Sequence, residues 1–136
     1  MSISALFKNL GAPLHNIMWS WGAVRATDGV VFLRVWQDEC RKINNRLFMR
    51  ITANEHFQRN DPNNLGYQER LYQIDLIKDG AKSYMVICVA RDVEAVPRAI
   101  IRFNSNEVFE GGELIFVEGN FWLEFGARVP VRNIRL

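Results

Sequence analysis

Short hydrophobic runs separated by polar or glycine-containing turns dominate this chain, a pattern typical of strands rather than of long helices. The start of the chain is the exception. Residues 2–10 are predicted to form a short helix, because Ser2 or Ser4 can accept a hydrogen bond from the free N–H groups of its first turn and Gly11 suits its end.

The clearest strand signal is a predicted hairpin between residues 17 and 36. Residues 17–24 and 30–36 are rich in aromatic and β-branched side chains, and Asp28-Gly29 favours a tight turn between them. Residues 46–53 alternate well enough to form a third strand. Its apolar face is expected to carry Leu47, Met49 and Ile51.

A polar segment and one longer helix are expected next. Residues 54–64 are rich in Asn, Asp and Pro and are interpreted as a surface loop. Asp61-Pro62 is suited to open an amphipathic helix of roughly four turns, because Asp can cap and Pro fits the first turn. Asp79-Gly80 is a fitting C-terminal stop.

The remainder is predicted to be β-rich, with a hairpin whose turn lies at Gly119-Asn120. The expected strands are residues 83–90, 98–103, 113–119 and 120–129, and a final strand over 129–136 that closes the sheet. The sequence therefore predicts an α+β fold: a compact, strongly curved, mainly antiparallel sheet or small open barrel, with one main helix and a short N-terminal helix.

Length and composition favour one domain over residues 1–136. No apolar stretch approaches the roughly 20 residues that cross a bilayer, and the first residues do not resemble a secretory signal. We therefore expect a cytoplasmic protein without a membrane partner. Cys40 and Cys88 form no CxxC motif, which favours two reduced, buried thiols and argues against a metal site, and no cofactor motif is present.

The net charge is only +2, but arginine provides 13 of the 17 basic residues. Guanidinium groups form two-pronged hydrogen bonds with phosphates and with guanine. Basic residues concentrate between residues 41 and 59 and again after residue 124. These regions indicate binding of an anion such as a nucleic-acid backbone, with ordinary solvated faces as the alternative.

Three of the four tryptophans fall between residues 19 and 36. If residues 17–24 form a strand, Trp19 and Trp21 share one face and Trp36 lies near the far end of the paired strand. Such a wall could receive a planar ligand, although tryptophan is also a common core residue. The candidate ligand-binding residues are Trp19, Trp21, Trp36, Gln37 and Asp38, and the candidate phosphate-binding residues are Arg25, Arg34, Arg46 and Arg50.

The tryptophan-containing segment W-S-W-G-A, followed by V-F-L-R-V-W-Q-D-E, resembles the PUA-like superfamily of nucleic-acid readers, which includes the EVE, YTH and SRA groups. The resemblance rests on residues 19–39 and on the predicted strand order. It implies a small barrel with a base pocket lined by the three tryptophans, in which Gln37 or Asp38 reads the base edge. It also implies a reader without a nuclease segment.

The leading hypothesis is a nucleic-acid-binding module for DNA or RNA that recognises a modified or flipped-out base. An alternative is an accessory domain that binds a protein partner or a second copy, with the terminal strand adding to a neighbouring sheet edge. A third is a small-molecule enzyme that uses carboxylates in the barrel mouth. No catalytic motif is present, so this third hypothesis requires Asp38, Glu39 or Asp75 to converge with a histidine.

Overall fold

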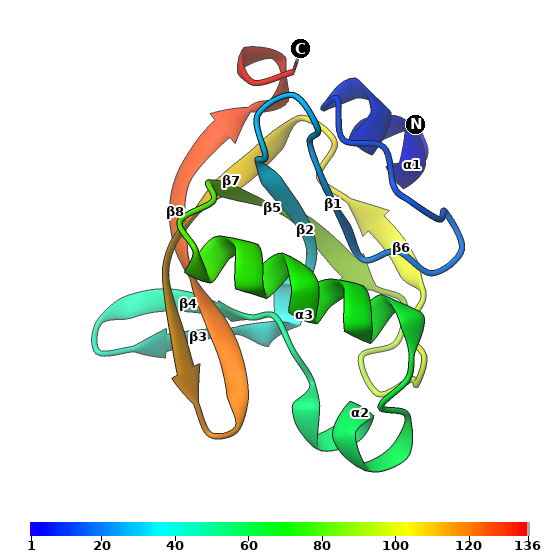
Figure 1. Cartoon of the computed structure of the whole chain (residues 1–136), viewed down its shortest axis with the longest axis vertical. Helices are drawn as coiled ribbons and strands as arrows, with labels where there is room; N and C mark the ends of the chain where they lie inside the picture. Colours follow the sequence, from blue (N-terminus) through cyan, green and yellow to red (C-terminus); the bar gives the residue numbers. More distant parts are fainter. Residues whose placement is uncertain (136) are drawn as a thin grey trace.

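The computed structural model describes residues 1–135 and shows one mixed sheet with helices on both of its faces (Figure 1). The helices are α1 (Ile3–Asn9), α2 (Asn54–Asn60) and α3 (Leu65–Lys78), with 3-10 turns η1 (Gln37–Glu39) and η2 (Val131–Asn133). The strands are β1 (Gly22–Val24), β2 (Val31–Trp36), β3 (Cys40–Ile43), β4 (Arg46–Arg50), β5 (Ser83–Ala90), β6 (Ile100–Phe103), β7 (Glu107–Val117) and β8 (Asn120–Pro130).

The strands pair in the order β1-β2-β5-β7-β8-β4-β3, and β6 pairs with the end of β5. Only β2 and β5 run parallel among the paired strands of the described residues, because the chain crosses from one to the other through β3, β4, α2 and α3. Within residues 1–135, the outermost strands β1 and β3 do not pair with each other, so the sheet stays open. The predicted α+β fold with an open, mainly antiparallel sheet is confirmed.

Side chains alternate between two cores on opposite faces of β2. Phe32 points to the core that contains α1, while Leu33 and Val35 point to the core that contains α3. In Figure 1, α3 lies across the front of the sheet and α1 lies near the C-terminus. The α1 core includes Leu6, Phe7, Tyr84, Val86 and Val108, and the α3 core includes Met49, Ile51, Ile74, Ile77, Met85 and Leu123.

The first predicted helix and hairpin are confirmed, but the first strand is much shorter than expected. Ser2 caps α1 and Gly11 follows it with φ 74°. β1 begins only at Gly22, because residues 17–19 form a turn in which the Ser20 N–H donates to the Asn16 carbonyl at 2.9 Å. The predicted strand alternation of Trp19 and Trp21 is therefore wrong.

The segment expected to be a loop contains a helix. Residues 54–60 form α2, and α3 starts at Leu65 with Asn64 as its cap rather than at Asp61-Pro62. The Asn64 side chain accepts a hydrogen bond from the Tyr67 N–H at 3.0 Å. The predicted C-terminal stop is correct, since α3 ends at Lys78 and Gly80 has φ 103°.

The C-terminal half follows the predicted strands with two corrections. The β7–β8 hairpin is longer than expected, and its turn residues are Glu118 and Gly119, both with positive φ. The predicted last strand is wrong: β8 already ends at Pro130, Val131–Asn133 is a 3-10 turn, and Leu136 lies outside the described residues.

β3, which pairs with β4, was not predicted. No helix within residues 1–135 is long and apolar enough to span a membrane.

Candidate functional site

A hollow of about 520 Å³ lies on the face of the sheet that α3 only partly covers. Its floor is apolar and consists of Leu47, Met49, Ile87 and Val89. Its aromatic side chains are Phe103, Phe109 and Phe125. Its polar lining consists of Gln37, Cys40, Arg102, Asn104 and Arg128. This volume falls in the range of sites that enclose small ligands.

Strand alternation explains why the hollow lies beside the α3 core. Met85 is buried in that core, and Ile87 and Val89 follow it on the same face of β5 with partial exposure. Met49 belongs both to the core and to the floor of the hollow. The hollow therefore adjoins the hydrophobic core of this face, and strand residues form its floor.

Two phenylalanines form the aromatic wall. Phe109 on β7 and Phe125 on β8 have ring centroids 4.3 Å apart at an interplanar angle of 34°. The guanidinium carbon of Arg128, which is directly opposite Phe109 in the β-ladder, lies 5.5 Å from the Phe109 ring centroid. An arginine over an aromatic ring is a common cation–π arrangement. Phe109 is 8% exposed and Phe125 is half-buried, so the wall offers an apolar surface mainly through Phe125, with a positive charge at its edge.

The polar lining is basic, since it contains two arginines and neither aspartate nor glutamate. Arg102 is exposed and forms no ion pair with any residue of 1–135. Arg128 lies 3.7 Å from Glu107, a long contact between an exposed arginine and a half-buried glutamate. Lys42 is directly opposite Leu47 in the β3–β4 ladder and so shares the face of the hollow. Anions are therefore favoured at this rim.

The structure places the three candidate tryptophans in separate environments. Trp19 contacts His15, with ring centroids 5.7 Å apart. Trp21 contacts Phe57 at 5.2 Å and lies against the start of α3, where a Cβ on Gly66 would come within 2.5 Å of the indole. Trp36 packs against the α1 core, and the Arg98 guanidinium lies 5.4 Å from its ring. None of the three lines the hollow.

Gln37 is the only one of the five candidate ligand-binding residues that lines the hollow. Asp38 forms a two-pronged ion pair with Arg98, with N–O distances of 2.8 and 2.9 Å. Gln37 was singled out because it follows Trp36, whereas the strands that shape the hollow gave no such signal.

The four candidate phosphate-binding arginines are all engaged within the chain. Arg25 is buried and donates to Asp28 and to the Leu10 carbonyl. Arg34 donates to the Ser20 carbonyl at 2.9 Å, and burial lowers its pKa. Arg46 pairs with Glu113 and Glu124, and Arg50 pairs with Glu39 and Glu55. Each of the four arginines therefore has a carboxylate or carbonyl partner within the folded chain.

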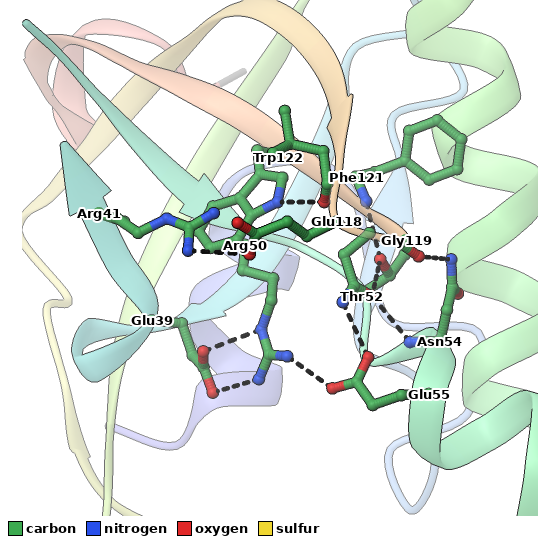
Figure 2. Close-up of polar contacts among 12 residues, drawn as sticks. Glu39, Arg41, Arg50, Thr52, Asn54, Glu55, Glu118, Gly119, Phe121 and Trp122 are labelled. Carbon is green, nitrogen blue, oxygen red and sulfur yellow. Dashed lines mark hydrogen bonds and ion pairs between the residues drawn. The ribbon is translucent and has the colours of Figure 1, made fainter. Parts of the chain in front are cut away.

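The carboxylates of the enzyme hypothesis lie beside arginine or lysine rather than histidine. Figure 2 shows Arg50 between Glu39 and Glu55, with its guanidinium 2.7 Å from one carboxylate and 2.8 Å from the other. Asp38 pairs with Arg98, and Asp75 lies 3.8 Å from Lys78. No group of three metal-ligating side chains occurs among residues 1–135. These carboxylates serve as ion-pair partners.

The two cysteines differ in accessibility, contrary to the expectation that both are buried. Cys88 is 1% exposed and Cys40 lies at the edge of the hollow. Burial raises the pKa of Cys88 to about 11 and also raises the pKa of Cys40. We expect iodoacetamide to modify one thiol in the native protein, slowly, and two in denaturant. Mass spectrometry that finds Cys88 modified in the folded protein would contradict this placement.

Comparisons with known proteins do not assign a family. No family model matches the chain, and neither curated proteins nor solved structures give a match.

Proposed function

We propose that this protein is a nucleic-acid-binding module that holds one unstacked base in the hollow. The observation that carries the proposal is the combination of an aromatic wall with a basic, carboxylate-free polar lining. Proteins bind single-stranded nucleic acid in this way, with bases stacked on aromatic rings and phosphates neutralised by basic side chains. The resemblance to PUA-like readers suggests the same class of ligand and stays a prediction.

The side chains that would contact the ligand in the hollow differ from those predicted from the tryptophan hairpin. The base lies against Phe125, whose ring contacts the buried Phe109, and Gln37 hydrogen-bonds to the base. Arg102 and Arg128 contact the base or the flanking phosphates because they line the hollow, and Lys42 contributes charge from the same face of the sheet. The candidate arginines at positions 25, 34, 46 and 50 instead stabilise the fold through their carboxylate and carbonyl partners.

Binding is tested by fluorescence anisotropy with a labelled single-stranded DNA and an RNA of roughly ten nucleotides, a length within the usual site sizes. We expect affinity to fall steeply between low and physiological salt, because binding releases counterions. Arg102→Gln should weaken binding about tenfold and make the salt dependence shallower. Bound oligonucleotide should also slow alkylation of Cys40.

The matched control is Arg59→Gln. Arg59 is exposed in the last turn of α2 and does not line the hollow, so this variant removes the same charge elsewhere. Equal weakening by both substitutions would mean that only net charge matters and would exclude the hollow as the site. No binding by any DNA or RNA would overturn the proposal and leave a protein partner, tested by light scattering, as the leading hypothesis.

A further inference from the structure

We infer that the hollow selects guanine over the other bases. This inference rests on the proposed function and concerns which base edge the polar lining can satisfy. The deciding features are the hydrogen-bonding groups of Arg102, Asn104 and Gln37, which all line the hollow.

Arg102 supplies a planar fork of N–H donors. Its guanidinium has no acceptor atoms and forms no ion pair with any described residue, so its donors are available to a ligand. Arg102 is directly opposite Val89 in the β5–β6 ladder, which holds its backbone next to the floor of the hollow. Arginine recognises guanine by donating two parallel hydrogen bonds to O6 and N7.

Asn104 also contributes a donor, because its side-chain oxygen is already engaged. Asn104 Oδ1 accepts hydrogen bonds from the Asn106 and Glu107 N–H groups, both at 3.0 Å. These two bonds determine which end of the amide is the oxygen and leave Nδ2 as the uncommitted group. The Asn104 side chain can therefore donate a hydrogen bond to a ligand, whereas its oxygen is already occupied.

Strong acceptors are scarce among the lining side chains. The lining contains no carboxylate, and Gln37 Oε1 is its one side-chain amide oxygen without a hydrogen bond inside residues 1–135. On its major-groove edge guanine presents two adjacent acceptors, O6 and N7, whereas adenine presents N7 beside an amine and cytosine presents an amine, and each of these amines needs an acceptor. Guanine carries its own donors, N1–H and the exocyclic amine N2, on the other edge of the base, and Gln37 Oε1 is the acceptor that the lining offers them. Uracil and thymine lack the adjacent acceptor pair that the guanidinium fork matches.

The test uses labelled DNA strands in which all positions are abasic except a central guanine, adenine, cytosine or thymine. These strands carry the same phosphate charge, so differences in affinity come from the base. We expect guanine to bind about tenfold or more tightly than each of the others, the range of one bidentate pair. Replacing N7 by carbon in 7-deazaguanine should remove most of this preference.

Arg102→Lys separates base reading from charge, because lysine keeps the positive charge but not the planar fork. Arg102 is exposed, so the variant should fold, which its unchanged melting temperature would confirm. We expect it to lose the guanine preference, whereas Arg59→Lys, at an exposed arginine that does not line the hollow, should keep both the preference and the affinity for a fully abasic strand. Equal binding of all four bases, or a preference that survives Arg102→Lys, would overturn the inference while leaving the proposed function intact. No binding of any strand would overturn both.

Discussion

Arg70→Ala should lower the free energy of unfolding by about 3–4 kcal/mol, because it removes a buried side chain together with its hydrogen bonds. Arg70 on α3 is 5% exposed. Its guanidinium donates to the carbonyls of Ile51 at 2.8 Å, Trp21 at 3.0 Å and Arg34 at 2.7 Å. These carbonyls follow β4, precede β1 and lie in β2, so Arg70 connects the two sides of the sheet that do not pair.

The arginine remains charged at neutral pH in spite of its burial. Burial and the nearby Arg34 lower the pKa of Arg70 to about 10, still well above 7. Its partners are carbonyl oxygens rather than a carboxylate, so their hydrogen bonds offset the cost of burying the charge. This makes the side chain a structural connection across the open sheet rather than an anion-binding group.

Urea unfolding followed by circular dichroism at pH 7 measures the effect. Arg70→Met fills much of the space without hydrogen bonds, so a loss of stability in this variant isolates the polar contribution. Arg59→Ala removes an exposed arginine and should change stability by no more than about 0.5 kcal/mol. If Arg70→Ala stays within that margin of wild type, the proposed connection across the sheet is wrong.

The elements that sequence analysis predicted correctly are those with local signals. α1 has Ser2 at its start and Gly11 after its end, and the strands show their periodicity within a few residues. α2 was missed because its stabilising contacts come from a distant hairpin. The residue before its first turn is Ala53, whose side chain forms no capping hydrogen bond, while the Asn54 side chain donates to the Gly119 carbonyl at 2.9 Å. Such a contact spans 65 residues and leaves no local pattern.

The tryptophan segment shows how a tertiary contact overrides a strand pattern. Residues 17–21 have strand-like composition, but the Ser20 hydroxyl accepts from the Asn16 N–H and donates to Glu69 on α3. These bonds hold a turn just where alternation predicted an extended chain. Burial raises the pKa of Glu69. Trp21 then packs against α2 and α3 while Trp19 contacts His15, so the two indoles do not form one wall.

The hollow could not be found by spacing, because its lining extends from Gln37 to Arg128 and meets only when the strands pair. One signal was nonetheless present in the sequence. Arg102 lies between Ile101 and Phe103 in a short apolar strand, where a charged residue must face solvent or a ligand. Its relation to Asn104, Phe109 and Phe125 required the three-dimensional structure.

Asn120→Ala should lower the free energy of unfolding by about 2–4 kcal/mol, because it leaves buried polar groups without partners. Asn120 begins β8 and is 5% exposed. Its Oδ1 accepts from the Thr52 hydroxyl and the Asn54 N–H, both at 2.8 Å, and its Nδ2 donates to Glu55 at 2.8 Å. Figure 2 shows this polar cluster between the β7–β8 turn and the start of α2.

Asn120→Asp distinguishes the hydrogen bonds that Oδ1 accepts from the one that Nδ2 donates. The variant keeps an acceptor for Thr52 and Asn54 but places a carboxylate against Glu55. Although burial raises the pKa of Glu55, the hydrogen bond from Asn120 and the charge of Arg50 outweigh it and lower that pKa in the native protein. In the variant the two carboxylates repel each other, so one of them binds a proton more readily in the folded than in the unfolded state.

The stability deficit of Asn120→Asp should therefore shrink as pH falls through the carboxyl range, and it should shrink by more than the deficit of Asn120→Ala, which loses only the hydrogen bond that lowers the pKa of Glu55. Urea unfolding at pH 7 and at pH 4 distinguishes the two. Asn63→Ala, in the exposed segment between α2 and α3, is the matched control and should stay within about 0.5 kcal/mol of wild type. Equal pH dependence of the two Asn120 variants would show that Nδ2 does not serve Glu55, and α2 would then depend on Asn54 alone for its attachment to the hairpin.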